Sequence, residues 1–437
     1  MINRREFVKG AAVLSAASVL PKFSFGNVKG SGKIKVGLCG CGWRGIGASI
    51  NMLEAAPNDV EFVAVCDLFE EKLDRAASRI ASFAKKQGNA SASAEKIKKF
   101  YGWNAIDEML KEDIDVVIEA TPPVFRTPHY EKIVAAGKHA FLEKPACVDV
   151  VQAKKMLELA DIADKKGLSV VCGTQRRYHE GYQELAKRVQ DGMIGDVLNI
   201  RAVWNDGGYV GHKQHDPKSD VYAYDTMEYQ IRNWSGFIWP SGDHIVEQHV
   251  HNLDVAMWFL GDTRKCQTVR GMGGRSTDLP YPKYGDRFSH FAVDFDMGEG
   301  LRIASYCHQD DETAREIGET FYGTKGIALP SYFGGGCVIT DRKGKVLYEA
   351  PNPKVQAIVA EHKFLIESLK SGKQVNRLRP LVNSTMLAIA GRESAYSGKK
   401  FKYDWFFAKS KGTLYCEEKF GKLPLRTVPV PGKTAIL

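Results

Sequence analysis

The sequence predicts an α/β protein with two domains: an N-terminal Rossmann-type, doubly wound parallel sheet and a C-terminal α/β domain with a large mixed or antiparallel open sheet. Three observations predict this fold. Apolar strands alternate with helical stretches over residues 33–170, a glycine-rich turn follows the first strand, and longer runs of alternating polarity dominate residues 171–437. At about 100–200 residues per domain, the 437-residue chain accommodates two large domains.

The elements of the first domain follow in the order that a parallel sheet requires. Strands are predicted at 33–39, 61–66, 115–120 and 139–142, and helices at 46–56, 70–99 and 128–136. Because these strands are apolar on both faces, helices have to cover both sides of the sheet. In the second domain, strands are predicted at 199–204, 288–295 and 301–306, helices at 247–260, 359–369 and 386–396, and irregular chain at 412–437.

The charge distribution argues against a nucleic-acid-binding protein. The chain has 61 Lys and Arg against 52 Asp and Glu, but residues 1–33 hold six of the basic residues and one of the acids. Residues 34–437 therefore carry 55 basic and 51 acidic residues, without a basic cluster interleaved with aromatic residues. The nine cysteines include no C-x-x-C pair, so neither a disulfide framework nor a zinc site is predicted.

Residues 1–32 have the pattern of a targeting segment. Arg4 and Arg5 stand in an R-R-x-F-x-K sequence, and ten small or apolar residues, 11–20, follow before Pro21. Ten helical residues rise about 15 Å, half the hydrocarbon thickness of a bilayer, so no membrane span is predicted. The segment resembles a twin-arginine signal, which exports folded proteins, and it predicts a periplasmic location.

A glycine motif with a distant acid predicts a dinucleotide site. Gly40, Gly42 and Gly45 form G-x-G-x-x-G directly after the first strand and before the first helix. Such glycines allow a tight turn, the approach of a pyrophosphate and close helix packing. Asp67 ends the next strand, where a carboxylate binds ribose hydroxyls and repels a 2′-phosphate, so NAD is predicted over NADP.

Two further motifs carry groups suited to proton and hydride chemistry. Lys144, within Glu143-Lys144-Pro145, follows the fourth predicted strand, at the edge where such sheets bind ligands. Its ammonium can stabilise an alkoxide, although a surface lysine is the plainer interpretation. Glu247 lies four residues before His251 on a predicted helix, where it can orient the imidazole as a general base. Helical spacing alone leaves a structural histidine at a domain interface as an equal alternative.

Residues 205–243 are rich in aromatic and hydrogen-bonding side chains, a composition that suits a carbohydrate. The segment contains Tyr209, His212, His215, Tyr222, Tyr224, Tyr229, Arg232, Asn233, Trp234 and Trp239. His212, His215 and Asp216 offer metal-type ligands, but nothing fixes a complete set, so no metal is predicted. Neither a G-x-S-x-G nor an H-E-x-x-H pattern occurs.

The order of these motifs resembles that of the Gfo/Idh/MocA oxidoreductase family across nearly all of residues 33–410. The motifs that carry the resemblance are Gly40-x-Gly42-x-x-Gly45, Asp67, Thr121-Pro122-Pro123, Glu143-Lys144-Pro145 and Glu247-x-x-x-His251-x-x-Asp254. The resemblance implies catalytic roles for Lys144 and His251 and a homo-oligomer built on the open sheet. One departure is Glu247, because the family usually has Asp at that position.

The site residues predicted from the motifs and the resemblance fall into three groups. Lys144, His251 and Glu247 are predicted to be catalytic. The predicted cofactor-binding residues are Gly40, Gly42, Trp43, Arg44, Gly45, Asp67, Thr121, Pro122, His129, Glu143 and Lys144. The predicted substrate-binding residues are Arg177, Tyr178, Asn205, Arg232, Trp234 and His251.

The resemblance and the export pattern together predict an NAD-dependent oxidoreductase acting on a sugar or glycoside. We expect oxidation of a ring hydroxyl, at C3 of a glycoside, to a ketone. Because the periplasm lacks an NAD pool, we expect the cofactor to be tightly bound. One alternative is a redox-neutral, NAD-dependent glycosidase resembling glycoside hydrolase family 109. Another is a non-catalytic sugar-binding accessory protein.

Overall fold

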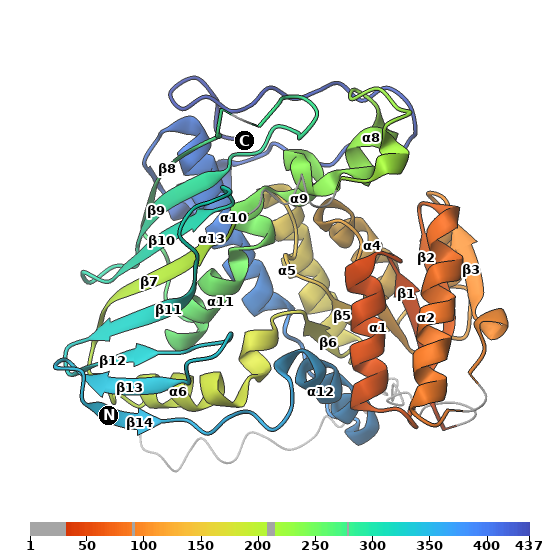
Figure 1. Ribbon diagram of the computed structural model, residues 1–437, viewed down its shortest axis with the longest axis horizontal. Coiled ribbons are helices and arrows are strands. Elements are labelled where there is room, and N and C mark those ends of the chain that lie inside the picture. Colours follow the sequence, from red (N-terminus) through yellow and green to blue (C-terminus); the bar gives the residue numbers. More distant parts are fainter. Residues whose placement is uncertain (1–31, 90–91, 208–214, 278) are drawn as a thin grey trace, which may run out of the picture.

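The computed structural model describes residues 32–89, 92–207, 215–277 and 279–437 (Figure 1). The predicted export signal, with Arg4 and Arg5, therefore lies outside the described residues, as do Tyr209 and His212. Within the described part of the chain, no helix combines the length and the apolar character needed to cross a bilayer. All nine cysteines are described and all are free thiols.

The first domain is built on a six-stranded parallel sheet with the strand order β3-β2-β1-β4-β5-β6. Its strands are β1 Ile34–Cys39, β2 Val60–Asp67, β3 Lys98–Tyr101, β4 Val116–Glu119, β5 His139–Leu142 and β6 Val170–Cys172. The chain runs outward from β1 to β3, returns to β4, and continues outward to β6. This reversal confirms the doubly wound Rossmann-type sheet and places a ligand-binding switch point between β1 and β4.

Helices cover both faces of this sheet, as its apolar strands require. One face packs against α1 Trp43–Ala55, α2 Leu73–Lys86 and α12 Ala357–Ser371. The other packs against α3 Ala105–Met109, α4 Pro123–Ala135 and α5 Val150–Lys165. Figure 1 shows α1 and α2 side by side in front of the sheet, with α12 beside the lower part of α1, on the side away from α2. The segment that forms α12 thus returns from the second half of the chain to the first domain.

Two predicted helix boundaries in the first domain were wrong. The helix predicted at 70–99 ends at Lys86, and residues 98–101 form β3 instead. This strand is short, lies at the edge of the sheet and is mostly exposed, so its sequence lacks the apolar run that marks the other strands. The helix predicted to start at Pro128 begins at Pro123, because proline is tolerated in a first helical turn. The predicted domain boundary at residue 170 falls at the start of β6.

The second domain contains a nine-stranded mixed sheet with the order β14-β13-β12-β11-β7-β10-β9-β8-β15. The strands are β7 Val197–Asn205, β8 Thr268–Gly274, β9 His290–Asp296, β10 Arg302–His308, β11 Glu316–Gly323, β12 Gly326–Leu329, β13 Val338–Asp341, β14 Val346–Glu349 and β15 Phe401–Lys402. Of the pairings described, only β7 with β10 is parallel. The prediction of a large mixed sheet is confirmed.

The helices of the second domain include α6 Glu180–Gln190, α8 Met227–Arg232, α9 Ile238–Ser241, α10 His244–Glu247, α11 Val250–Phe259, α13 Leu378–Ser397 and α14 Tyr403–Lys409. Of these, α10, α11 and α13 pack on one face of this sheet, between it and the first domain, whereas α8 lies apart from the sheet (Figure 1). Helix α13 contacts both α5 and β8, so one continuous core joins the two domains. This shared core fixes α10 and α11 relative to the carboxyl ends of β4 and β5.

Candidate functional site

The glycine motif forms the turn between β1 and α1, and its three glycines meet different surroundings. Gly40 has a φ of +94°, and a Cβ there would lie 2.7 Å from the Ala120 carbonyl carbon. A Cβ on Gly45 would collide with the Gly40 carbonyl oxygen. A Cβ on Gly42 would have no atom within 4 Å. Two of the glycines are therefore required by the fold itself, whereas the space beside Gly42 is open.

The start of α1 is suited to an anion such as a pyrophosphate. No side chain caps this end of the helix, and its first turn contains no acid. The first N–H groups of a helix have no partner within the helix, and the space beside Gly42, the N-cap of α1, is open. The predicted residue Trp43 is 79% exposed at this end, with the Arg75 guanidinium 5.4 Å from its ring. The residues present thus fit the phosphates of a dinucleotide.

Asp67 ends β2, and its carboxylate is fixed by backbone groups on both sides. Oδ2 accepts the N–H of Cys41 at 2.7 Å, and Oδ1 accepts the N–H of Phe69 at 2.9 Å. A carboxylate has about four acceptor positions, so both oxygens keep capacity for further donors. Asp67 therefore supports the glycine turn while it remains able to bind ribose hydroxyls.

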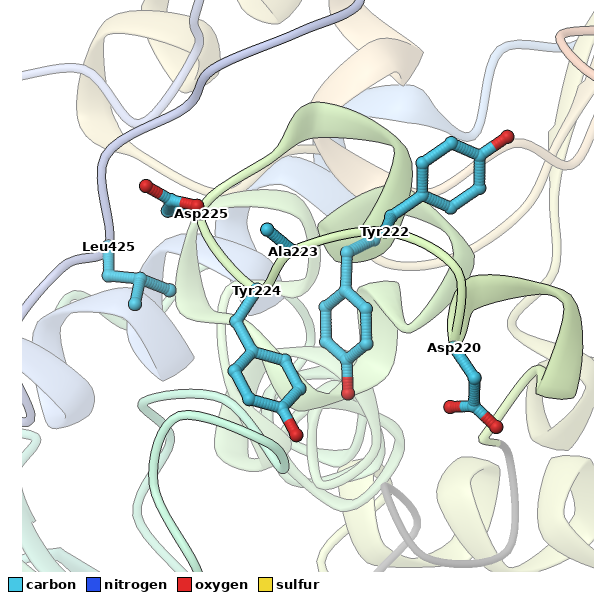
Figure 2. Close-up of a pocket in the computed structure, with 7 residues that line it drawn as sticks. Asp220, Tyr222, Ala223, Tyr224, Asp225 and Leu425 are labelled. Atoms are coloured by element: carbon cyan, nitrogen blue, oxygen red, sulfur yellow. The ribbon is translucent and has the colours of Figure 1, made fainter.

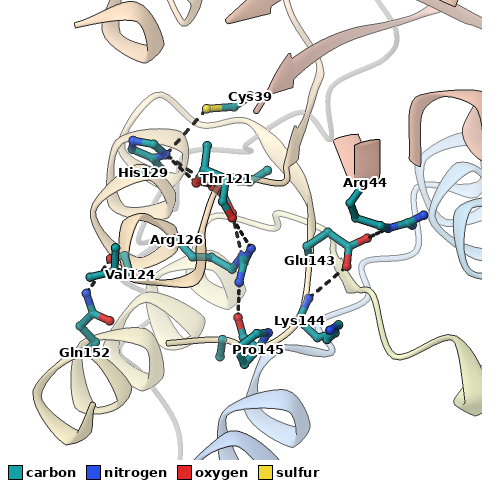
Figure 3. A network of polar contacts seen from close by, with 12 residues as sticks. Cys39, Arg44, Thr121, Val124, Arg126, His129, Glu143, Lys144, Pro145 and Gln152 are labelled. Carbon is teal, nitrogen blue, oxygen red and sulfur yellow. Dashed lines mark hydrogen bonds and ion pairs between the residues drawn. The ribbon is translucent and has the colours of Figure 1, made fainter. Parts of the chain in front are cut away.

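The turn after β4 carries a buried polar network (Figure 3). Glu119 accepts the hydroxyl of Thr121 and lies 2.8 Å from Nε of Arg126. His129 Nδ1 lies 3.4 Å from Glu119 and 3.7 Å from the Cys39 thiol. Burial opposes a charged imidazole, but the contacts with Cys39 and Glu119 outweigh it and raise the pKa of His129 to about 10.

The Cys39, Glu119 and His129 ligand atoms all lie within 4.8 Å of one another, a spacing that a metal ion can use. The Glu119 carboxylate, however, already binds the Arg126 guanidinium, whose positive charge opposes a cation at this position. The cluster is thus explained as a hydrogen-bond network. It places the predicted residues Thr121 and His129 together at the carboxyl end of β4.

Glu143 and Arg44 together connect the turn after β5 with α1 and α12 (Figure 3). Its carboxylate binds Nε of Arg44, in the first turn of α1, and accepts the N–H of Lys144 at 3.3 Å. Arg44 also lies 3.7 Å from Glu361 of α12. Burial, followed by the nearby Glu143, raises the pKa of Glu361 well above its usual range. The glycine turn and the turn after β5 are therefore held together by a charged contact.

Lys144 follows β5, and its ammonium reaches the second domain. Nζ donates to the Glu247 carbonyl oxygen, to Glu247 Oε1 at 3.2 Å and to Gln248 Oε1 at 3.3 Å. The side chain is only 12% exposed. An ammonium has three N–H donors, so each has a protein partner here. A substrate oxygen that binds Lys144 has to replace one of these contacts.

The helix predicted at 247–260 is interrupted. Helix α10 ends at Glu247 and α11 begins at Val250, with Gln248 and His249 between them. The four-residue spacing of Glu247 and His251 therefore does not place them on one helix face. The prediction that Glu247 orients His251 was wrong, because its carboxylate binds Lys144 instead. Glu247 still contacts a predicted catalytic group.

His251 lies in the first turn of α11 and is 7% exposed. Its ring stacks on Trp204 with the centroids 5.9 Å apart. Burial, together with the positive charges of Lys144, Arg176 and Arg44, lowers the pKa of His251 well below 6.5. The imidazole is therefore neutral at neutral pH and able to accept a proton. Its backbone N–H donates to the Gln248 carbonyl at 3.3 Å, and the Gln248 side chain accepts from Lys144, so Gln248 connects the backbone at His251 with the ammonium.

Arg177 is occupied by other protein groups. Its guanidinium makes two hydrogen bonds to Asp254, at 2.7 and 2.8 Å, and two to Asp262, both at 2.8 Å. Ser384 adds a hydrogen bond to Asp254 at 2.8 Å. Four of the five Arg177 donors therefore hold α11 and the segment after it in place, and a role of Arg177 in substrate binding stays a prediction.

Arg232 contacts the loop that follows β2 in the first domain. It binds Glu71 at 2.8 Å and Asp216 at 3.0 Å, and its guanidinium lies 3.8 Å from the centre of the Phe69 ring. Phe69 and Glu71 follow β2, on the side where Asp67 predicts the adenosine ribose. The structure therefore associates Arg232 with the loop after β2 rather than with a substrate at Lys144.

The three remaining predicted substrate residues lie on different elements of the fold. Tyr178 packs against Phe364 of α12, with the ring centroids 5.5 Å apart. Trp234 is half-buried in the short 3-10 helix Trp234–Gly236. Asn205 follows Trp204 at the end of β7, and its side-chain oxygen is buried without a hydrogen-bond partner among the described residues. Of these three residues, Asn205 has the clearest link to His251, through the adjacent Trp204.

A pocket of about 470 Å³ lies within the aromatic segment that predicted a carbohydrate (Figure 2). Its lining includes Tyr222, Tyr224, Asp220, Asp225 and Leu425. Figure 2 shows the Tyr224 ring projecting from the loop that precedes α8. None of the residues that line this pocket belongs to the Lys144 and His251 site. The segment is therefore aromatic and polar as predicted, but this pocket is not the catalytic one.

Sequence reasoning missed three buried charged residues at the site. Glu119, Arg126 and Glu361 are each at most 1% exposed. Glu119 left a signal, because it is an acid in the otherwise apolar run that forms β4. Arg126 and Glu361 left none, because their partners lie on other elements of the fold.

Comparisons with known proteins agree with this geometry. Residues 34–172 match the model of a family described as "Oxidoreductase family, NAD-binding Rossmann fold" (GFO_IDH_MocA). A glycosyl hydrolase family 109 protein of Shewanella amazonensis is 27% identical over 224 residues, which are 46% of this chain and 46% of that protein. A glycosyl hydrolase family 109 protein of Streptomyces coelicolor is 28% identical over 196 residues, which are 44% of this chain and 37% of that protein. The matches thus span less than half the length of these relatives.

Solved structures share the fold of both domains. Scyllo-inositol dehydrogenase from Lactobacillus casei with bound NAD(H) and scyllo-inositol has a TM-score of 0.62 at 19% identity, over 85% of this chain and 99% of that chain. Myo-inositol 2-dehydrogenase from Lactobacillus plantarum has a TM-score of 0.61 at 18% identity, over 85% of this chain and 99% of that chain. The glycine turn and Asp67 both lie within residues 34–172, the part of the chain that is similar to the NAD-binding Rossmann fold of this oxidoreductase family.

Proposed function

We propose that the protein binds NAD along the carboxyl edge of the first sheet and oxidises a ring hydroxyl of a sugar or glycoside. One observation carries this proposal: the Lys144 ammonium of the first domain binds Glu247 and Gln248 of the second, and its positive charge, together with burial, keeps the nearby His251 imidazole neutral. The relatives named as glycosyl hydrolases and the polyol dehydrogenases that share the fold support a ring with several hydroxyls as the substrate.

The two side chains supply complementary parts of an alcohol oxidation. His251 is neutral and accepts the hydroxyl proton, while Lys144 stabilises the negative charge that develops on the oxygen. NAD, when bound, accepts the hydride that leaves the ring carbon. The C–H bond breaks as the C=O bond forms, so two electrons and one hydrogen leave the carbon and the proton goes to the imidazole. A ketone remains on the ring.

Glu247 acts on Lys144 in this scheme. Its carbonyl and carboxylate oxygens hold the ammonium at the site before substrate arrives. We propose that the substrate oxygen replaces the Gln248 contact, which is the longest of the three and joins two side chains that can both move. Lys144 then keeps its orientation while it binds the reacting oxygen.

The cofactor and location follow from the same proposal. Asp67 disfavours a 2′-phosphate, so NAD is proposed over NADP. A periplasmic enzyme has to retain its cofactor, and the contacts of Arg44 with Glu143 and Glu361 across the glycine turn support tight binding. The face of the second sheet that lacks helices exposes Tyr306 and Tyr322, and we propose it as the contact surface of a homo-oligomer.

The test begins with the purified full chain. Denaturation followed by mass spectrometry should release a nicotinamide dinucleotide, and incubation with glycosides should yield a product two mass units lighter than the substrate. Lys144→Ala should retain the dinucleotide and lose the product. Absence of bound dinucleotide, together with no binding of added NAD, would contradict the proposal.

A second candidate is redox-neutral glycoside hydrolysis, which the names of the relatives favour. In that reaction, oxidation at C3 is followed by elimination of the aglycone, addition of water and return of the hydride. Both candidates begin with the same oxidation. Release of p-nitrophenol from aryl glycosides without net NADH formation supports the hydrolase, whereas an accumulating keto-glycoside supports the dehydrogenase.

A further inference from the structure

We propose that Arg126 is a positioning residue that holds the turn after β4 and the turn after β5 in register, so that Thr121 and Lys144 face the nicotinamide end of the cofactor together. This inference rests on the proposed NAD chemistry. Nothing in the sequence motifs points to Arg126, which lies on the first helical turn of α4.

The contacts of Arg126 join both turns (Figure 3). Nη2 donates to the Thr121 carbonyl oxygen at 2.8 Å, and Nη1 donates to the Pro145 carbonyl oxygen. Nε binds Glu119 Oε2 at 2.8 Å, so the guanidinium is anchored to the end of β4 as well. The residue is 1% exposed. One buried planar group therefore connects backbone atoms of the two turns.

The bonded carbonyls lie next to the predicted site residues. The Thr121 carbonyl belongs to the peptide that leads into Pro122, and Pro145 directly follows Lys144. A shift of either carbonyl moves the backbone of a residue at the cofactor edge. Displacement of a reacting group by about 1 Å can lower the reaction rate about 100-fold. The contacts of Arg126 with these two carbonyls therefore affect catalysis.

A lysine cannot reproduce this arrangement. The guanidinium offers donors in a fixed plane to three acceptors on two turns, whereas an ammonium is a compact charge on a flexible stem. Arg126→Lys therefore keeps the positive charge beside Glu119 but loses the link between Thr121 and Pro145. The double variant E119Q/R126Q removes both buried charges and the link, and thus avoids leaving Glu119 unpaired.

Arg392→Lys is the matched control. Arg392 is also fully buried and binds a carboxylate, that of Glu393, and two carbonyl oxygens, those of Val148 and Gly242. Val148 lies at the far end of the connection after β5, next to α5, and Gly242 precedes α10, so Arg392 makes no bond to the turn after β4 and does not link the two turns. Arg126→Lys and Arg392→Lys should therefore lower the melting temperature to a similar degree, and only Arg126→Lys should affect the nicotinamide end of the cofactor.

The experiment measures the affinities of NAD and ADP-ribose for the full-length wild type and for the three variants. ADP-ribose lacks the nicotinamide ring, so it reports on the glycine turn and Asp67 alone. For Arg126→Lys we expect NAD affinity to fall at least about fivefold while ADP-ribose affinity stays within about twofold, the size of one weakened charged hydrogen bond. Arg392→Lys should leave the ratio of the two affinities unchanged.

The possible outcomes separate the inference from the proposed function. If Arg126→Lys changes both affinities equally or neither, Arg126 has only a structural role and the inference is wrong. If Arg126→Lys does not fold, E119Q/R126Q has to show the same loss of NAD preference, and an unchanged ratio there also overturns the inference. If the wild type binds neither ligand, the proposed function fails first.

Discussion

The glycine turn and the α10–α11 region meet at one site, but they are held in place in different ways. The turn depends on its own backbone, because Gly40 and Gly45 have no space for a side chain. The α10–α11 region depends on distant ion pairs, such as that of Arg177 with Asp254 and Asp262. A local sequence motif therefore specifies the ligand-binding turn. The roles of charged residues in the α10–α11 region depend instead on the whole fold.

The largest expected effect concerns the group that connects the two regions. Lys144→Ala should lower kcat/KM by about 1,000-fold or more, because it removes the charge that stabilises the developing oxyanion. NAD affinity, measured by titration, should change little. Lys166→Ala serves as the control, since Lys166 contacts carbonyls at the end of α4 rather than the site. Activity within a factor of about two of the wild type would remove Lys144 from the mechanism.

His251→Gln should reduce kcat/KM by about 100-fold, the usual contribution of a general base. The melting temperature should hold within a few degrees, since the His251 ring stacks on Trp204 and makes no hydrogen bond to another described residue. His290→Ala, at an exposed histidine of β9, is the control. A large loss of stability with unchanged kinetics of the folded fraction would make His251 a structural residue.

The glycine turn can be tested by two substitutions with opposite consequences. Gly42→Ala meets no atom within 4 Å, so it should preserve the melting temperature while weakening NAD binding by about tenfold through contact with the phosphates. Gly45→Ala collides with the Gly40 carbonyl, so it should destabilise the fold even without cofactor. Thermal melts with and without NAD measure both effects. Equal behaviour of the two variants would contradict the distinction between them.

Arg177→Lys tests the ion pairs of the α10–α11 region. Lysine cannot bind Asp254 and Asp262 in a planar fork, so we expect a loss of about 2–4 kcal/mol in the free energy of unfolding. KM for the sugar should change less than stability does. A raised KM at unchanged stability, measured by steady-state kinetics and denaturant melts, would support Arg177 as a substrate residue.

The smallest expected effect is on pH dependence. Burial and the charges of Lys144, Arg176 and Arg44 hold the pKa of His251 well below 6.5, and the base has to be neutral to accept a proton. Activity is lost only where the imidazole becomes protonated, which is below its lowered pKa. The acid limb of kcat/KM should therefore lie below pH 6.5. A midpoint at or above that value would show that the imidazole titrates normally.

The sequence predicted the parts of the protein that local patterns determine. The glycine turn, Asp67, Lys144 and the mixed second sheet were all visible as motifs or as periodicity. The break between α10 and α11 was not, because residues 247–260 keep an apolar helical spacing across it. Nor could the pairing of Arg126 with both turns be predicted, since it requires the positions of β4, α4 and β5 in three dimensions.

The most direct test of the central claim follows hydride from the ring to the cofactor. The protein with NAD is mixed with a pyranoside deuterated at its ring C–H positions, quenched, and the dinucleotide is analysed by mass spectrometry. The proposed mechanism predicts deuterium in the nicotinamide ring, for a dehydrogenase and for a redox-neutral hydrolase alike, and none with Lys144→Ala. Consumption of the pyranoside without any label in the dinucleotide would contradict it.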